Sequence, residues 1–228
     1  MSQELKEQIL KGVVTILLFT SVFFAARQAA VLVNKGEAET EERFCVVIDA
    51  GHGGDDPGKI GINGALEKEI NLQVAEKLKA FLEASDVKVV MTRTTDGGLY
   101  DENASNKKVQ DMKQRIQIIE EAQPQLAVSI HQNSYQSPEV KGAQVFYYKH
   151  SAEGKKLAQI LQKSLKENLD TENKRQEKED STYYMLLHTG APTVIAECGF
   201  LSNPQEAALL NTACLLYTSD AADEGLGV

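Results

Sequence analysis

The chain has 228 residues, of which 42% are hydrophobic and 25% are charged, and this composition is typical of one globular domain with terminal segments. It excludes wholesale disorder and low-complexity or collagen-like repeats. The net charge of −9 argues against general binding to a nucleic-acid backbone, which requires a surplus of Lys and Arg on one surface. Three cysteines without a C-x-x-C pair argue against a disulfide framework and against a cysteine-built zinc site.

The N-terminus carries an apolar segment that differs from the rest of the chain. Residues 13–26 form an unbroken apolar run preceded by Lys6 and Lys11, and residues 29–33 resume it. The first run has the length of a signal peptide, and the two together approach the ~20 residues that span a bilayer. We therefore predict a signal anchor or signal peptide over residues 1–34. The anchor is favoured because no small-residue cleavage site stands out, and a buried core helix is the alternative.

A charged linker, residues 35–43, separates this segment from the globular part of the chain. Lys6 and Lys11, with only a few acids before the apolar run, favour a cytoplasmic N-terminus. The catalytic domain, predicted over residues 44–212, is then expected on the far side of the membrane. Its predicted location is extracytoplasmic, either membrane-anchored or secreted.

Apolar patterning predicts alternating strands and helices within this domain. Continuous apolar runs indicate strands buried on both faces, and stripes of helical period indicate amphipathic helices. In chain order we expect a strand at 44–50, a helix at 67–84, a strand at 87–91, a helix marked by 109–119, strands at 126–130 and 143–148, a helix marked by 157–169 and a strand at 193–196. Residues 171–182 are densely charged and are expected to be a mobile loop. The alternation predicts a single α/β domain whose central sheet is mostly parallel and flanked by helices.

Four polar residues are expected at one edge of this sheet. His52, His131 and Glu197 lie at or just beyond the carboxyl ends of predicted strands, where open α/β sheets bind ligands. Glu67 begins the helix after the first glycine-rich loop and can face the same edge. Two histidines and one carboxylate are a ligand set for catalytic zinc with one position left for water, and a further carboxylate can move protons.

Each of these residues also has an ordinary explanation. A single histidine at a strand end is often structural, and an acid in the first turn of a helix is favoured by the helix dipole. Glu197 is harder to explain, because an ionised carboxylate after an apolar strand is costly unless it is paired or used. We interpret His150 and His188 as ordinary residues, although His188 is a candidate to line the cleft.

Four segments resemble, in order, the motifs of the zinc-dependent type 3 N-acetylmuramoyl-L-alanine amidases. They are Val47–Gly54 with Asp56–Gly58, Glu67–Leu72, Val128–Asn133 and Pro192–Asn203. The resemblance implies that His52, Glu67 and His131 bind one Zn²⁺ and that Glu197 activates the water. It also implies that the substrate is peptidoglycan, cut at the amide between N-acetylmuramic acid and L-alanine.

The motif E-C-G-F-L-S-N together with an N-terminal apolar segment is most similar to the germination-type branch of this family in spore-forming Firmicutes. That similarity implies a role in forming muramic-δ-lactam in the spore cortex and a location in the forespore intermembrane space. It also implies a lipoprotein activator as a partner. The alternative functions are a zinc peptidase that acts on the stem peptide and a non-catalytic cell-wall binding module.

Further residues are candidates for substrate binding or for structure. We predict that Asn133 and Arg115 hold substrate, with a structural salt bridge as the alternative for Arg115. Asp49 is expected to support the metal ligands from behind or to be structural, and not to be a ligand itself. Cys45 and Cys198 lie in or beside apolar strands and are predicted to be buried free thiols, with a disulfide between them as the alternative.

The end of the chain departs from the family pattern. Where the family continues with a helix that packs on the domain, residues 213–228 resemble a translated adapter sequence and end in glycines. We predict that this tail is non-native or disordered, with a divergent native tail as the alternative.

Overall fold

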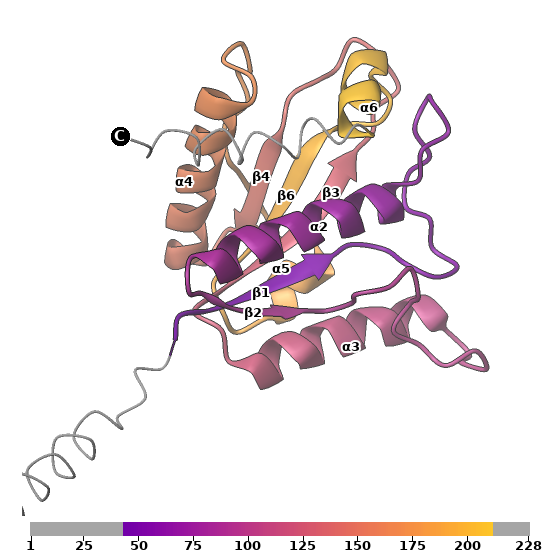
Figure 1. Cartoon of the computed structure of the whole chain (residues 1–228), viewed down its shortest axis with the longest axis vertical. Helices are drawn as coiled ribbons and strands as arrows, with labels where there is room; N and C mark the ends of the chain where they lie inside the picture. Colours follow the sequence, from indigo (N-terminus) through magenta and orange to yellow (C-terminus); the bar gives the residue numbers. More distant parts are fainter. Residues whose placement is uncertain (1–42, 212–228) are drawn as a thin grey trace, which may run out of the picture. The chain divides into compact units, whose positions relative to one another are not determined.

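The computed structural model describes residues 43–211, and these residues build a sheet with helices on both faces (Figure 1). The predicted anchor over 1–34, most of the linker and the predicted tail over 213–228 lie outside the described residues. No helix within residues 43–211 is long and apolar enough to cross a membrane.

The sheet within the described residues has six strands in the order β2-β1-β3-β6-β4-β5. The strands are β1 (Cys45–Ala50), β2 (Lys88–Met91), β3 (Leu126–Asn133), β4 (Gln144–Tyr148), β5 (Lys178–Asp180) and β6 (Thr193–Phe200). Neighbouring strands run parallel except at the pair β4–β6. The predicted α/β domain with a mostly parallel sheet is confirmed.

Helices cover both faces of the sheet. They are α2 (Glu67–Ala84), α3 (Lys107–Ala122), α4 (Ala152–Asn168), α5 (Tyr184–His188) and α6 (Pro204–Leu210). Helices α2 and α4 pack on the face that carries Val46 and Ile48 of β1, whereas α3 and α5 pack on the face that carries Val47. Because both faces are covered, every residue of β1 is buried, which explains its continuous apolar sequence.

Several elements differ from the sequence expectations. Strands β3 and β6 run past their expected ends, so His131 and Glu197 lie inside the strands rather than after them. Residues 171–182 are not a continuous loop as expected, because residues 178–180 pair with β4 and the buried Asn173 donates its side-chain amide to the Ala143 carbonyl. The short helices α5 and α6 were not predicted, since they carry too few turns to show a period.

The two described cysteines are free thiols, as predicted, and the disulfide alternative is wrong. Cys45 is buried in β1, whereas Cys198 in β6 is half-buried rather than fully buried. Cysteine here acts as a small apolar side chain within the sheet.

A buried ion pair fastens α3 to the end of β1. Asp49 is 1% exposed and its carboxylate accepts hydrogen bonds from Arg115 Nη1 at 2.7 Å, from Thr92 Oγ1 at 2.7 Å and from Ser129 Oγ at 2.5 Å. Burial alone would raise the pKa of Asp49, but Arg115 and the two hydroxyls outweigh it and lower the pKa to about 2. These contacts support the structural role, one of the two predicted for Asp49.

This ion pair makes the free energy of unfolding depend on pH in the acid range. The folded-state pKa of Asp49 lies below its ordinary value of 3.8. The ionised carboxylate therefore contributes fully to the free energy of unfolding above pH 3.8, and this contribution is lost as the pH falls towards 2. We expect Asp49→Asn to lower the free energy of unfolding by about 3 kcal/mol at neutral pH, because Arg115 is left buried with one acid fewer. Denaturant unfolding at pH 7 and pH 3 tests this, with the exposed Glu139→Gln as control. An equal loss at both pH values would contradict it.

Candidate metal centre

The loop that follows β1 presents His52 in a left-handed backbone conformation, with φ of 63°. Its neighbour Gly51 must be glycine, because a Cβ there would lie 2.3 Å from the imidazole of His131. Gly58 has φ of 68°, and a Cβ there would lie 2.5 Å from a carboxylate oxygen of Glu67. These close approaches explain why the first motif is rich in glycine.

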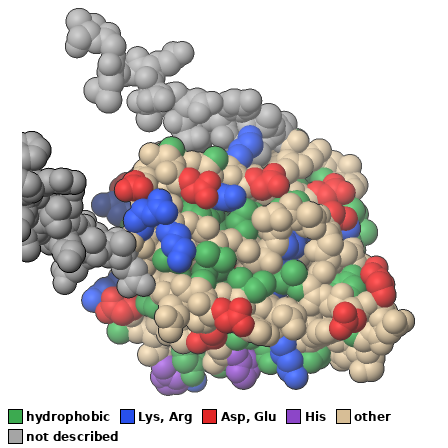
Figure 2. Space-filling view, turned by 60° about the horizontal axis from the view of Figure 1, so that its bottom comes forward, with side chains coloured by type: hydrophobic (Ala, Val, Ile, Leu, Met, Phe, Trp, Pro, Cys, Tyr) green, Lys and Arg blue, Asp and Glu red, His purple; other side chains and the backbone are tan. Residues whose placement is uncertain are grey.

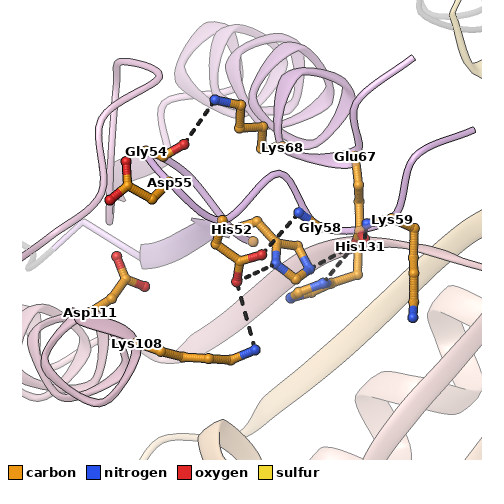
Figure 3. Close-up of polar contacts among 12 residues, drawn as sticks. His52, Gly54, Asp55, Gly58, Lys59, Glu67, Lys68, Lys108, Asp111 and His131 are labelled. Carbon is orange, nitrogen blue, oxygen red and sulfur yellow. Dashed lines mark hydrogen bonds and ion pairs between the residues drawn. The ribbon is translucent and has the colours of Figure 1, made fainter. Parts of the chain in front are cut away.

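Glu67, the first residue of α2, lies at the centre of the site and is 1% exposed. Its Oε1 is 3.1 Å from His52 Nε2 and 3.0 Å from His131 Nδ1, and its Oε2 accepts a 2.7 Å hydrogen bond from the backbone N–H of Lys59. Figure 3 shows the two imidazoles converging on this carboxylate. Burial would raise the pKa of Glu67, but the two imidazoles outweigh it, so the pKa is lowered and the carboxylate stays ionised.

His131 and Glu197 are brought together by strand pairing. They occupy partner positions of the parallel strands β3 and β6. Glu197 is 7% exposed, and its Oε2 has no hydrogen-bond partner among the described residues. Burial, with a further contribution from the charge of Glu67, raises the pKa of Glu197. A buried carboxyl with a raised pKa and a free oxygen is suited to exchange a proton with a bound reactant.

Three of the predicted residues fit a metal ion. The candidate ligand atoms of His52, Glu67 and His131 all lie within 4.8 Å of one another. His52 Nδ1 is 3.0 Å from a carboxylate oxygen of Asp56, which fixes the ring with Nε2 towards the site. Two imidazole nitrogens and one carboxylate oxygen are a donor set for a catalytic divalent ion. The structure thus brings together the set that sequence reasoning selected.

The site opens into a cavity of about 770 Å³. Its wall includes Glu197, Asn133 at the end of β3, Tyr183 before α5, and Tyr100 and Lys108 from the loop and helix after β2. Sequence reasoning missed Tyr183 and Lys108, because their arrival at the cavity depends on how α5 and α3 pack. Burial, followed by the charge of Glu197, raises the pKa of Tyr183 to about 12, so its hydroxyl stays protonated.

Arg115 borders the cavity, but its contacts favour the structural alternative over the predicted substrate-binding role. It is 1% exposed, and its guanidinium N–H groups are directed to Asp49, Asp111 and the carbonyls of Ala50 and His52. The structural salt bridge, its alternative role, is what the geometry supports.

The remaining histidines, His150 and His188, are not among the residues that line the cavity. His188 is exposed and its ring contacts that of Tyr184 at a tilt of 45° with centroids 4.2 Å apart, and His150 contacts the ring of Tyr148. Neither lines the cavity, so His188 is not a cleft residue.

Over the face shown in Figure 2, acidic and basic side chains are interspersed, with apolar side chains between them.

The family model described as N-acetylmuramoyl-L-alanine amidase matches residues 46–218, which include every residue of this site. This chain belongs to that amidase family. Among curated proteins, the germination-specific N-acetylmuramoyl-L-alanine amidase of Bacillus subtilis is 38% identical over 168 residues, covering 72% of this chain and 70% of the relative.

Solved structures agree with this membership. The CwlD amidase of Clostridioides difficile, in complex with the GerS lipoprotein, has a TM-score of 0.74 at 36% identity and covers 76% of this chain and 91% of that one. The amidase AmiC2 of Nostoc punctiforme has a TM-score of 0.64 at 30% identity, covering 76% of this chain and 88% of its own. The chain is therefore a cell-wall amidase with the fold of these relatives.

The electrostatics of His52 predict how metal binding in this amidase depends on pH. Burial lowers the pKa of His52, but Glu67 and Asp56 outweigh it and raise the pKa above 6.5. A metal ion requires the neutral imidazole, so protons should displace the metal from a higher pH than they would at an ordinary histidine. We expect equilibrium dialysis to show that metal affinity falls as the pH drops from 8 to 5. Asp56→Asn should move the fall to lower pH, and an affinity that is constant between pH 5 and 8 would contradict the prediction.

Proposed function

We propose that this amidase is a zinc hydrolase that cleaves the amide between N-acetylmuramic acid and L-alanine in peptidoglycan. The observation that carries the proposal is the cluster of His52, Glu67 and His131 beside the unpaired buried carboxyl of Glu197. His52, Glu67 and His131 would hold the ion. Zinc bound in such a site would activate a water molecule and polarise the substrate carbonyl.

The proton transfers belong to Glu197. Its carboxylate takes a proton from the attacking water and returns it to the alanine nitrogen as the amide breaks. A raised pKa makes this cycle efficient near neutral pH, because the group can both accept and release the proton.

The rest of the cavity wall positions the substrate. Asn133 lies on the wall at the end of β3, and its Oδ1 accepts a 2.8 Å hydrogen bond from the N–H of Ser134, which leaves its amide N–H groups for the substrate. Lys108 and Tyr183 face the same cavity and add a cation and a hydroxyl. We assign these groups to the glycan and to the start of the stem peptide.

Two relatives support a proposal for the biological setting. One relative is named germination-specific, and one solved relative is in complex with a lipoprotein. We infer that this chain acts in spore-cortex maturation, on the route to muramic-δ-lactam, and that a lipoprotein activates it. Such a role requires an extracytoplasmic location, with residues 1–34 as the anchor or signal peptide and the forespore intermembrane space as the compartment.

One experiment tests the reaction and separates it from its alternatives. The purified full chain is incubated with peptidoglycan alone, with a chelator, and with the chelator followed by added zinc. We expect new N-terminal alanine that disappears with chelator and returns with zinc. New termini elsewhere in the stem peptide would indicate a peptidase, and binding without cleavage would indicate a cell-wall binding module.

Glu197→Gln should separate metal binding from proton transfer. The amide is of the same size and cannot accept the proton, so we expect the rate to fall by about 10²- to 10⁴-fold. Zinc content and melting temperature should stay close to the parent values, as they should in the control Glu139→Gln. Turnover near the parent rate would remove Glu197 from the mechanism, and loss of zinc would make it a ligand.

A further inference from the structure

A buried asparagine connects the three segments that carry the candidate metal ligands. Asn71 is 0% exposed and lies one turn after Glu67 in α2. Its Nδ2 donates to the carbonyl of Gly51 at 3.1 Å and approaches Glu67 Oε1 at 3.4 Å, and its Oδ1 accepts from Gln132 Nε2 at 3.2 Å. Gly51 precedes His52 in the chain, and Gln132 follows His131. One side-chain amide therefore contacts Glu67 and both residues that adjoin the ligand histidines.

Gln132 completes this arrangement from β3. It is 3% exposed, and its backbone N–H donates to Glu67 Oε1 at 3.1 Å. The Gly51 carbonyl can only accept, so the amide nitrogen of Asn71 must face it and the amide oxygen must face Gln132. Gln132 then donates to Asn71 and leaves its own Oε1 buried without a hydrogen-bond partner among the described residues. An unpaired buried acceptor lowers the free energy of unfolding, so the orientation of the Gln132 amide towards Asn71 is maintained at the expense of the stability of the fold.

We propose that Asn71 and Gln132 are positioning residues that set the affinity of this site for zinc. They hold the Glu67 carboxylate with Oε1 between His52 and His131, and they fix the separation of the segments that carry those histidines. Groups that orient metal ligands typically contribute about 10- to 100-fold to metal affinity. The inference rests on the proposed zinc site.

The variant Asn71→Leu removes the amide while it approximately keeps the side-chain volume. The Gly51 carbonyl still accepts a 3.1 Å hydrogen bond from Arg93 Nη2, so the backbone of the His52 loop retains a partner. Gln132→Met is a milder second variant, because it removes the donor to Asn71 and also the unpaired oxygen. It keeps the backbone N–H that binds Glu67.

Gln162 provides a matched control elsewhere in the core. It is 1% exposed and is also a buried amide that bridges two elements, since Oε1 accepts from the N–H of Val145 at 2.9 Å and Nε2 donates to the Ala143 carbonyl at 3.2 Å. Among the described residues, neither of these hydrogen bonds reaches a segment that carries a candidate ligand. Gln162→Leu therefore reports what the loss of a buried amide does to the fold alone.

The experiment measures the zinc dissociation constant of the full chain by competition with a chromophoric chelator, together with the melting temperature of each metal-free protein. We expect Asn71→Leu to weaken zinc binding by about 10- to 100-fold, Gln132→Met to weaken it less, and Gln162→Leu to leave it unchanged. Saturating zinc should restore most of the turnover of Asn71→Leu, because the proton-transfer group Glu197 is intact.

The outcomes that overturn the inference are distinct from failure of the zinc proposal. If the parent chain binds no zinc, the proposed function fails. If the parent binds zinc and both site variants bind it as tightly as the parent does, Asn71 and Gln132 do not position the site. The same conclusion follows if Gln162→Leu weakens zinc binding as much as the site variants do. If Asn71→Leu does not fold, the dissociation constant of Gln132→Met decides the question.

Discussion

The site depends on one buried carboxylate. Oε1 of Glu67 lies about equally far from the ligand nitrogens of both histidines and accepts the backbone N–H of Gln132, while Oε2 accepts the N–H of Lys59. An ionised group with 1% exposure is stable only when it is surrounded by donors of this kind. The surrounding chain is arranged to supply them, and a divalent ion between the same atoms would compensate the remaining negative charge.

Two buried guanidiniums hold the loop that delivers His52 to this carboxylate. Arg115 donates to the carbonyls of Ala50 and His52, and Arg93 donates to those of Ala50, Gly51 and Lys68. The carbonyls at the end of β1 are thereby turned towards the arginines, and His52 is held at a positive φ that a non-glycine residue rarely adopts. Arg93 also connects this loop to the first turn of α2, next to Glu67. Charged residues of the core thus serve the geometry of the site as well as the stability of the fold.

Strand register supplies the other half of the chemistry. Pairing of β3 with β6 sets His131 opposite Glu197, and a register shift follows between His131 and Asn133. A slip of either strand by one residue would turn its side chain to the opposite face and separate the pair. The proton-transfer group and one candidate ligand are therefore placed by the hydrogen bonds of the sheet, which are more rigid than a loop. His52 and Asp56, in contrast, lie on a glycine-rich loop whose path is fixed by close packing against the ligands.

The sequence by itself determined the elements and the residue types of the site. Glu67–Ala84 was predicted to the residue, because a stripe of helical period and an acid in the first turn are local features. The set of His52, Glu67, His131 and Glu197 was also accessible, since polar residues at the ends of apolar strands are conspicuous. What only the tertiary structure decided is how distant segments meet. Arg115 could be a substrate residue or a salt bridge until Asp49 lay beside it, and β5 shows no pattern until β4 pairs with it. Tyr183, Lys108 and the amide of Asn71 gain their roles from packing between elements far apart in the chain, and no local periodicity records such contacts.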